Sequence, residues 1–238
     1  MNVSKWLGVF GLSALAGCGG QNEGKLMDDT GPVVEGISIW PGFVPDGRAH
    51  VAGRLPVLEA YDTLDGGVIF LGDSITEGAD LPTLFPRVET RNFGIGWDTT
   101  DGVLTRLSQL ARHHPDRLFL LIGTNDTGYD HGPDHIALNI IEIVHRLQRS
   151  LPETDIYVLS ILPRETAGNM TILPANRLVA EAAQKEGFTF LNIAPAFAAE
   201  DGTMLPELTG DGLHLNDEGY TVFSELLRPC VEEGCEGL

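Results

Sequence analysis

Short runs of apolar residues, each followed by a turn-forming residue, recur along this chain. The runs that we expect to be strands span residues 68–71, 90–93, 118–122, 156–162 and 188–193. Three of them end at Gly72, Gly123 and Pro163. An unbroken apolar run is typical of a strand buried on both faces, since a half-exposed strand would alternate with polar residues. The pattern therefore predicts a mainly parallel sheet of about five strands.

Helical patterns separate these runs. Apolar residues recur every three or four positions within 99–113, 136–151, 174–186 and 217–227. Strands that alternate with amphipathic helices predict an α/β fold, with helices on both faces of a parallel sheet. Residues 37–67 contain several prolines and glycines, and we expect them to be irregular. In such folds the functional site forms at the carboxyl ends of the strands.

The N-terminus has the pattern of an export signal. Lys5 precedes an apolar run over 6–15, which is too short for a stable membrane span. The run ends in Leu-Ala-Gly-Cys18, which resembles a bacterial lipoprotein box. The resemblance implies cleavage before Cys18, lipidation of its thiol and anchoring in the bacterial cell envelope, in the periplasm or outer membrane. The alternative is an ordinary signal peptide with a chance cysteine.

We therefore divide the chain into a signal peptide over 1–17, a flexible tether over 18–36 and a single domain over 37–238. The tether is rich in glycine and polar residues and has no periodicity. Cys230 and Cys235 lie near the C-terminus, and an exported chain favours a disulfide between them. Free thiols or a weak metal pair are the alternatives.

The charge of the chain excludes one class of partner. The formal net charge is −19, from 15 basic and 34 acidic residues. Nucleic-acid binding depends on basic patches that neutralise phosphates, so we expect no nucleic-acid partner.

Polar motifs follow the predicted strands or precede the last helix. They are Gly72-Asp73-Ser74-Ile75, the run from Asn92 to Asp98, Gly123-Thr124-Asn125-Asp126 and Asp211-Gly212-Leu213-His214. Each one alone is more typical of a turn or a helix cap. Their order and their shared place at strand ends indicate one site.

Together the motifs resemble those of the SGNH (GDSL-type) hydrolase family, from residue 68 to residue 227. The run from Asn92 to Leu107 is especially similar to the branch that includes platelet-activating-factor acetylhydrolase. The resemblance implies a three-layer flavodoxin-like fold and ester hydrolysis without a metal or an organic cofactor. It also implies a small-molecule, carbohydrate or lipid ester as substrate.

Ser74 is the candidate nucleophile. A serine hydroxyl needs a base, and His214 supplies one, with Asp211 three residues earlier to orient its ring. The competing interpretation makes Ser74 a helix N-cap, with Glu77 as the partner of a capping box.

The resemblance also assigns an oxyanion hole. Its donors are the Ser74 N–H, the Asn125 side chain and a backbone N–H of the glycine-rich run. Trp97 stands where the family has its glycine, and a shift of register would make Gly96 the donor. Any residue but proline offers an N–H, so the donor survives, while the indole adds bulk beside the acyl group.

These residues predict a serine esterase that acts on short acyl or acetyl esters of sugars or lipids. A second hypothesis is an inactive binding protein on the same scaffold, and it stays open because Trp97 stands at the oxyanion position. A third hypothesis is a metal-dependent hydrolase that uses Asp130, His131, Asp134 and His135. We predict no metal there, because no further strand supplies a ligand.

Overall fold

The computed structural model describes residues 33–34, 37–38, 45–129, 131–164 and 169–235. Its centre is one parallel sheet in the order β4-β3-β5-β6-β7. The strands are β3 (Val68–Gly72), β4 (Thr90–Gly94), β5 (Arg117–Leu121), β6 (Asp155–Leu159) and β7 (Thr189–Leu191). The predicted three-layer α/β fold with a parallel sheet is confirmed.

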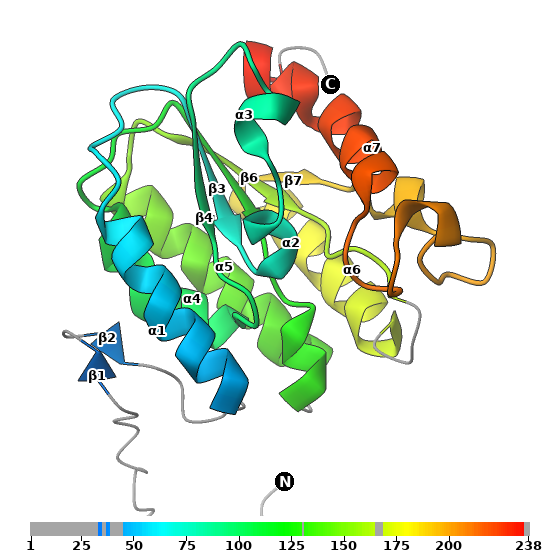
Figure 1. The fold of residues 1–238 in the computed structure, drawn as a ribbon. Coiled ribbons are helices and arrows are strands. Elements are labelled where there is room, and N and C mark those ends of the chain that lie inside the picture. Colours follow the sequence, from blue (N-terminus) through cyan, green and yellow to red (C-terminus); the bar gives the residue numbers. More distant parts are fainter. Residues whose placement is uncertain (1–32, 35–36, 39–44, 130, 165–168, 236–238) are drawn as a thin grey trace, which may run out of the picture.

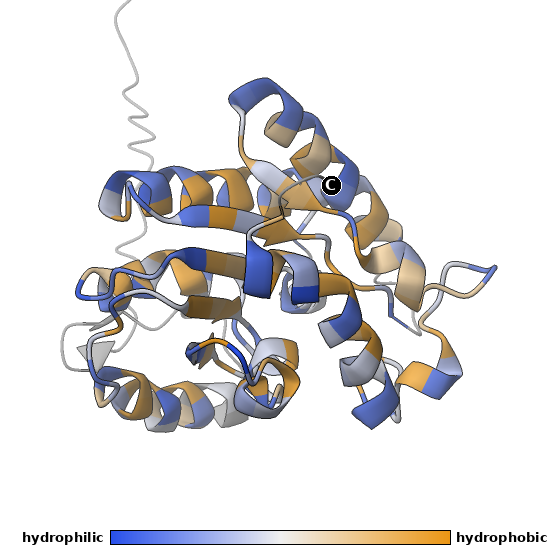
Figure 2. Cartoon of the chain, turned by 90° about the horizontal axis from the view of Figure 1, so that it is seen from above, coloured by the Kyte–Doolittle hydropathy of each residue, from blue (hydrophilic) through white to orange (hydrophobic). Residues whose placement is uncertain are grey.

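Helices cover both faces of this sheet (Figure 1). One layer holds α1 (Pro45–Glu59), α4 (Thr100–Arg106), α5 (Pro133–Ser150) and α6 (Asn169–Glu186). The other holds α2 (Ser74–Glu77), α3 (Leu81–Leu84) and α7 (Asp217–Arg228). Figure 2 shows apolar strands between helices whose polar sides face outward. Every residue of β3 is buried, which explains its unbroken apolar run.

Helix α1 overturns the expectation of irregular structure over 37–67. Its buried side chains are Val51, Leu55 and Leu58, which are spaced four and three residues apart and pack against the sheet. This stripe is narrow, and the rest of the helix includes glycine and Pro56, so the sequence carries little helical signal. Pro45 occupies the first position, where the missing N–H costs nothing.

Two predicted helices have different bounds. The helix predicted over 99–113 ends at Arg106 and continues as a 3₁₀ turn, η1 (Leu107–Leu110). Helix α6 begins five residues before Pro174, where we expected it to start. Pro174 removes the hydrogen bond to the carbonyl of Met170, but Met170 is 81% exposed, so water can solvate that carbonyl.

Shorter helical turns complete the chain. They are η2 (Asn125–Tyr129), η3 (Ala194–Phe197), η4 (Pro206–Leu208) and the π-helical η5 (Pro229–Glu233). Cys230 and Cys235 form a disulfide across η5, with Cα atoms 4.1 Å apart.

The predicted signal peptide and Cys18 lie outside the described residues. The end of the predicted tether differs from expectation, because Val33–Val34 forms strand β1 and pairs with β2 (Ile37–Ser38). Within the described part of the chain, no helix combines the length and the apolar character that a membrane span requires.

Candidate active site

Three neighbouring strands bring the sequence motifs to one edge of the sheet. Gly72, the last residue of β3, is in register with Gly94 of β4 and Leu121 of β5. The motifs that contain Ser74, Trp97 and Asn125 therefore leave the sheet side by side. Gly72 admits no side chain, because an added Cβ would lie against the carbonyl oxygen of Leu121 and the Thr76 side chain.

Ser74 is the first residue of α2, and its hydroxyl does not cap that helix. The N-cap is Asp73, whose carboxylate accepts the backbone N–H of Ile75 at 3.0 Å. The Glu77 carboxylate does not complete a capping box and instead accepts the N–H of Gly96 at 2.5 Å. The capping interpretation of Ser74 is therefore wrong, and its hydroxyl is free for another role.

A chain of hydrogen bonds joins Ser74 to His214 and Asp211. Ser74 Oγ lies 2.9 Å from His214 Nε2, and His214 Nδ1 lies 2.6 Å from Asp211 Oδ2. With Nδ1 donating to the carboxylate, Nε2 has a lone pair that accepts the Ser74 proton. The other carboxylate oxygen accepts the backbone N–H groups of His214 and Leu213, at 2.8 and 3.0 Å. Asp211 is thereby fixed to the same short loop as the ring it orients.

Thr209 closes that loop. Its hydroxyl donates to the carbonyl of His214 at 2.7 Å and accepts the N–H of Gly212 at 2.9 Å. Gly212 has φ +77, a left-handed conformation that favours glycine. The Asp-Gly pair in the motif is therefore a turn that brings Asp211 back under the ring of His214.

The two aspartates of the site have opposite pKa shifts. Burial by itself would raise the pKa of Asp211, but hydrogen bonds from the His214 ring and from backbone N–H groups lower it to about 2. Asp211 is thus ionised at neutral pH and available to stabilise an imidazolium. Burial raises the pKa of Asp73 to about 7, although the hydrogen bond from Ile75 opposes the shift.

Asn125 is positioned by a buried ion pair. Its Nδ2 donates to the carbonyl of Asp98 at 2.9 Å, which leaves the second amide hydrogen for a ligand. The Asp98 carboxylate accepts from Arg106 Nε at 2.7 Å, and Arg106 also donates to the carbonyl of Gly72 at 3.0 Å. Burial raises the pKa of Asp98, and the Arg106 guanidinium opposes that shift. These bonds connect the ends of β3, β4 and β5.

The structure distinguishes the two candidate backbone donors. The Gly96 N–H is already donated to Glu77. The Trp97 N–H makes no hydrogen bond among the described residues, so the geometry favours Trp97 over Gly96. Trp97 has φ +68 and a half-exposed side chain. A left-handed residue is ordinarily glycine, which fits the glycine that the resemblance implies at this position.

Part of the cluster that the hypothesis of a metal-dependent hydrolase names comes together. The ligand atoms of His131 and His135 lie near Asp101 and Asp126, all within 4.8 Å of one another. Asp134 is exposed and does not join them, and Asp130 lies outside the described residues.

Sequence reasoning missed Arg106 and Glu77. Arg106 lies within the apolar stripe of its helix, beside Val103 and Leu110, and a cation in a buried stripe is a usable signal for an ion pair. Glu77 carries no comparable signal, since its partner Gly96 is nineteen residues away.

The chain is similar to known proteins over most of its length. Residues 70–222 match the GDSL-like lipase/acylhydrolase family. The platelet-activating factor acetylhydrolase IB subunit alpha1 of Rattus norvegicus is 32% identical over 187 residues, which cover 72% of this chain and 79% of the relative.

Two solved structures share the fold. A protein from Streptococcus pneumonia, described as a platelet activating factor, has a TM-score of 0.70 at 28% identity and covers 78% of this chain and 93% of its own. A GDSL-like lipase from Bacteroides thetaiotaomicron has a TM-score of 0.63 at 21% identity, over 77% of this chain and 98% of its own. The match over residues 70–222, with Ser74 and His214 in contact within it, shows that this chain belongs to the GDSL-like lipase/acylhydrolase family of hydrolases.

Proposed function

We propose that this chain is a serine esterase that hydrolyses carboxylic esters with short acyl groups. The observation that carries the proposal is the continuous contact from Ser74 Oγ to His214 Nε2 and from His214 Nδ1 to Asp211. This is the arrangement that nucleophilic catalysis by serine requires.

The reaction has two halves. Ser74 Oγ attacks the ester carbonyl while His214 Nε2 takes its proton, and His214 then protonates the departing alcohol, which leaves an acyl group on Ser74. In the second half His214 activates a water molecule that hydrolyses the acyl-enzyme. Asp211 stabilises the imidazolium in both halves, because its lowered pKa keeps it ionised.

Three N–H donors would stabilise the oxyanion. They are the backbone N–H groups of Ser74 and Trp97 and the amide of Asn125. The bond from Asn125 to Asp98, and the buried pair of Asp98 with Arg106, support the amide before substrate arrives. Donors fixed in advance are effective because little reorganisation is needed at the transition state.

The proposed acyl group is acetyl or another short chain. The Trp97 indole is half-exposed and belongs to the residue whose N–H would face the oxyanion, so we infer that it walls the acyl pocket. The relatives named acetylhydrolases support the same choice. The alcohol half is proposed to come from a sugar or a lipid.

A fluorophosphonate probe tests the serine mechanism directly. We expect stoichiometric labelling of the wild-type chain and none of Ser74→Ala. Ser224 is a buried serine on α7 and provides the matched control, so Ser224→Ala should label normally. Equal labelling of wild type and Ser74→Ala contradicts the role of Ser74 as nucleophile. No labelling of a folded wild type contradicts the proposal as a whole and favours a binding protein.

An ester panel tests the acyl pocket. With p-nitrophenyl esters from acetyl to decanoyl, we expect wild type to prefer acetyl and Trp97→Gly to accept longer chains, measured as kcat/KM. An unchanged chain-length preference in Trp97→Gly would show that the indole does not line the acyl pocket.

A further inference from the structure

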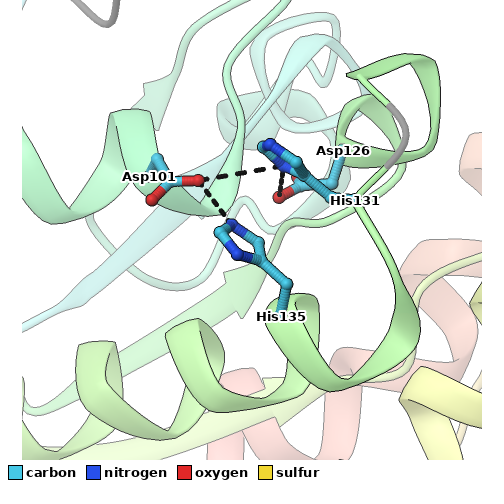
Figure 3. Close-up of side chains that lie close together, drawn as sticks. All are labelled: Asp101, Asp126, His131 and His135. Carbon is cyan, nitrogen blue, oxygen red and sulfur yellow. Dashed lines mark hydrogen bonds and ion pairs between the residues drawn. The ribbon is translucent and has the colours of Figure 1, made fainter. Parts of the chain in front are cut away.

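A cluster of two carboxylates and two imidazoles lies beside the candidate active site and takes no part in the proposed reaction. Asp101 belongs to the first turn of α4, Asp126 to η2 and His135 to the first turn of α5. His131 lies between η2 and α5. Figure 3 shows the four side chains converging from these elements, and their ligand atoms lie within 4.8 Å of one another.

The spacing of these atoms is close to that of a metal coordination shell. Asp101 Oδ2 lies 2.7 Å from His135 Nε2 and 3.8 Å from His131 Nδ1, while Asp126 Oδ1 lies 3.5 Å from His131 Nδ1. Tetrahedral zinc with bonds of about 2.0–2.2 Å separates its ligand atoms by about 3.3 Å. The observed distances lie on both sides of that value, so small side-chain movements would complete the shell.

The cluster also lacks a cationic side chain. Among the described residues, no lysine or arginine nitrogen lies within 4.0 Å of the Asp101 or Asp126 carboxylate. The Asp126 side chain is fully buried, and that of Asp101 is only 16% exposed. Two carboxylates are therefore held close together away from water, and negative charge on them is costly to bury unless a cation balances it.

The Nε2 atom of His135 has two close polar neighbours with opposite demands. Its Nε2 faces the Asp101 carboxylate at 2.7 Å and the Asn139 amide nitrogen at 3.1 Å. The Thr100 hydroxyl donates to Asp126 and so accepts from Asn139, which fixes the amide nitrogen toward the ring. Nε2 can satisfy the acceptor or the donor, but not both. In the tautomer that leaves Nε2 unprotonated, its lone pair faces that of Asp101, and a cation bound by both atoms would remove this repulsion.

We propose that Asp101, Asp126, His131 and His135 bind one divalent transition-metal ion, with zinc the best fit. Two imidazole nitrogens and two carboxylate oxygens are ligands that zinc accepts, and four of them fill a tetrahedral shell. A filled shell indicates a structural ion that ties α4, η2 and α5 together. Asp126 directly follows Asn125, so the ion would also restrain the loop that carries this amide.

Metal binding by the untagged protein, after removal of bound metal with a chelator, tests the site. We expect one equivalent of zinc by elemental analysis, a rise in the thermal midpoint on adding zinc, and visible absorption bands of tetrahedral cobalt when Co²⁺ is used instead. His131→Ala and His135→Asn should each weaken zinc binding at least about tenfold. His135→Asn keeps a polar side chain at a partly exposed position, so it preserves the test if His131→Ala does not fold.

His145 provides a matched control. It lies on the same helix, α5, with Nε2 2.7 Å from Glu186, so it is a histidine–carboxylate pair without the cluster. His145→Ala and Ser74→Ala should both bind zinc like wild type, the second because the ion is independent of the ester reaction. The proposal is overturned if the folded wild type takes up no stoichiometric metal. It is also overturned if His135→Asn binds as tightly as His145→Ala.

Discussion

The two sides of the candidate active site are held in place by different means. Asp98 and Arg106, which support Asn125, are each 3% exposed and connect the ends of three strands. Asp211 and His214 have side chains that are 55% and 45% exposed, and their bonds lie within one short loop. One side therefore depends on the core and on long-range contacts, whereas the other is built from residues close in sequence. Damage to the first should appear as lost stability, and damage to the second as lost activity.

The largest effect we expect comes from breaking the contact between Ser74, which follows a core strand, and His214 on the exposed loop. Ser74→Ala and His214→Ala should each lower kcat by about 10⁴–10⁶, because the proposed nucleophile and base would act in one proton transfer. The double variant should be no worse than either single one. Turnover of p-nitrophenyl acetate measures the effect, with unfolding midpoints as a control. Additive losses in the double variant would contradict a shared step.

Removing the support on the core side should cost stability. Arg106→Met leaves the Asp98 carboxylate buried without its partner, and we expect a loss of about 3–5 kcal/mol in the free energy of unfolding. Arg146, whose half-exposed pair with Glu142 lies on α5, gives the matched control. Arg146→Met should cost far less, because solvent screens an exposed pair. Similar losses in urea denaturation for the two variants would show that the core pair has no special role.

Asp73 lies on the core side and should give stability a pH dependence. Its pKa is about 7 in the folded protein and 3.8 in the unfolded chain. Between these values the folded state holds a proton that the unfolded state has lost, so stability is full below about pH 4 and falls as pH rises toward 7. Asp73→Asn removes this dependence, and its stability relative to wild type should rise by on the order of 2–4 kcal/mol from pH 4 to pH 8.

Urea denaturation across that pH range measures the difference. Asp62 is exposed and provides the control, since Asp62→Asn should follow wild type at every pH. A difference between Asp73→Asn and wild type that does not change with pH would mean that Asp73 is ionised throughout.

The same contrast explains what could be predicted from the sequence. The strand at 68–71 is buried on both faces, and its apolar run has no other good explanation. Asp211 and His214 are three residues apart, so their pairing is a local property that the motif itself suggests. Ser74 meets His214, and Asn125 leaves the end of a neighbouring strand, because of strand order and helix placement. That step came from the resemblance to a family, not from spacing.

What could not be predicted depends on contacts between distant residues. Asp101 and Asp126 lie 25 positions apart and meet His135 only because α4, η2 and α5 pack at one edge of the sheet. Helix α1 could not be predicted, because three buried positions among prolines and glycines are too few to give a helical periodicity of apolar residues. The positive φ of Trp97 belongs to a turn that the Asp98 N–H closes on the carbonyl of Ile95. Bonds from Gly96 to Glu77 and from Arg106 to Asp98 hold the residues on either side of it.

Trp97 gives the smallest of the expected effects and tests how firmly the core side imposes its geometry. A non-glycine residue in the left-handed region costs about 1–2 kcal/mol. Trp97→Gly removes that strain. The greater conformational freedom of glycine in the unfolded chain lowers the free energy of unfolding by about 0.5–1 kcal/mol. The half-exposed indole contributes little burial, so we expect a net gain of about 0.5–1 kcal/mol in urea denaturation. Trp97→Ala removes the same indole but keeps the Cβ, so it should show no gain. If Trp97→Ala is stabilised as much as Trp97→Gly, the indole and not the backbone is the source of the strain, and the loop between Gly96 and Asp98 is less constrained than its hydrogen bonds indicate.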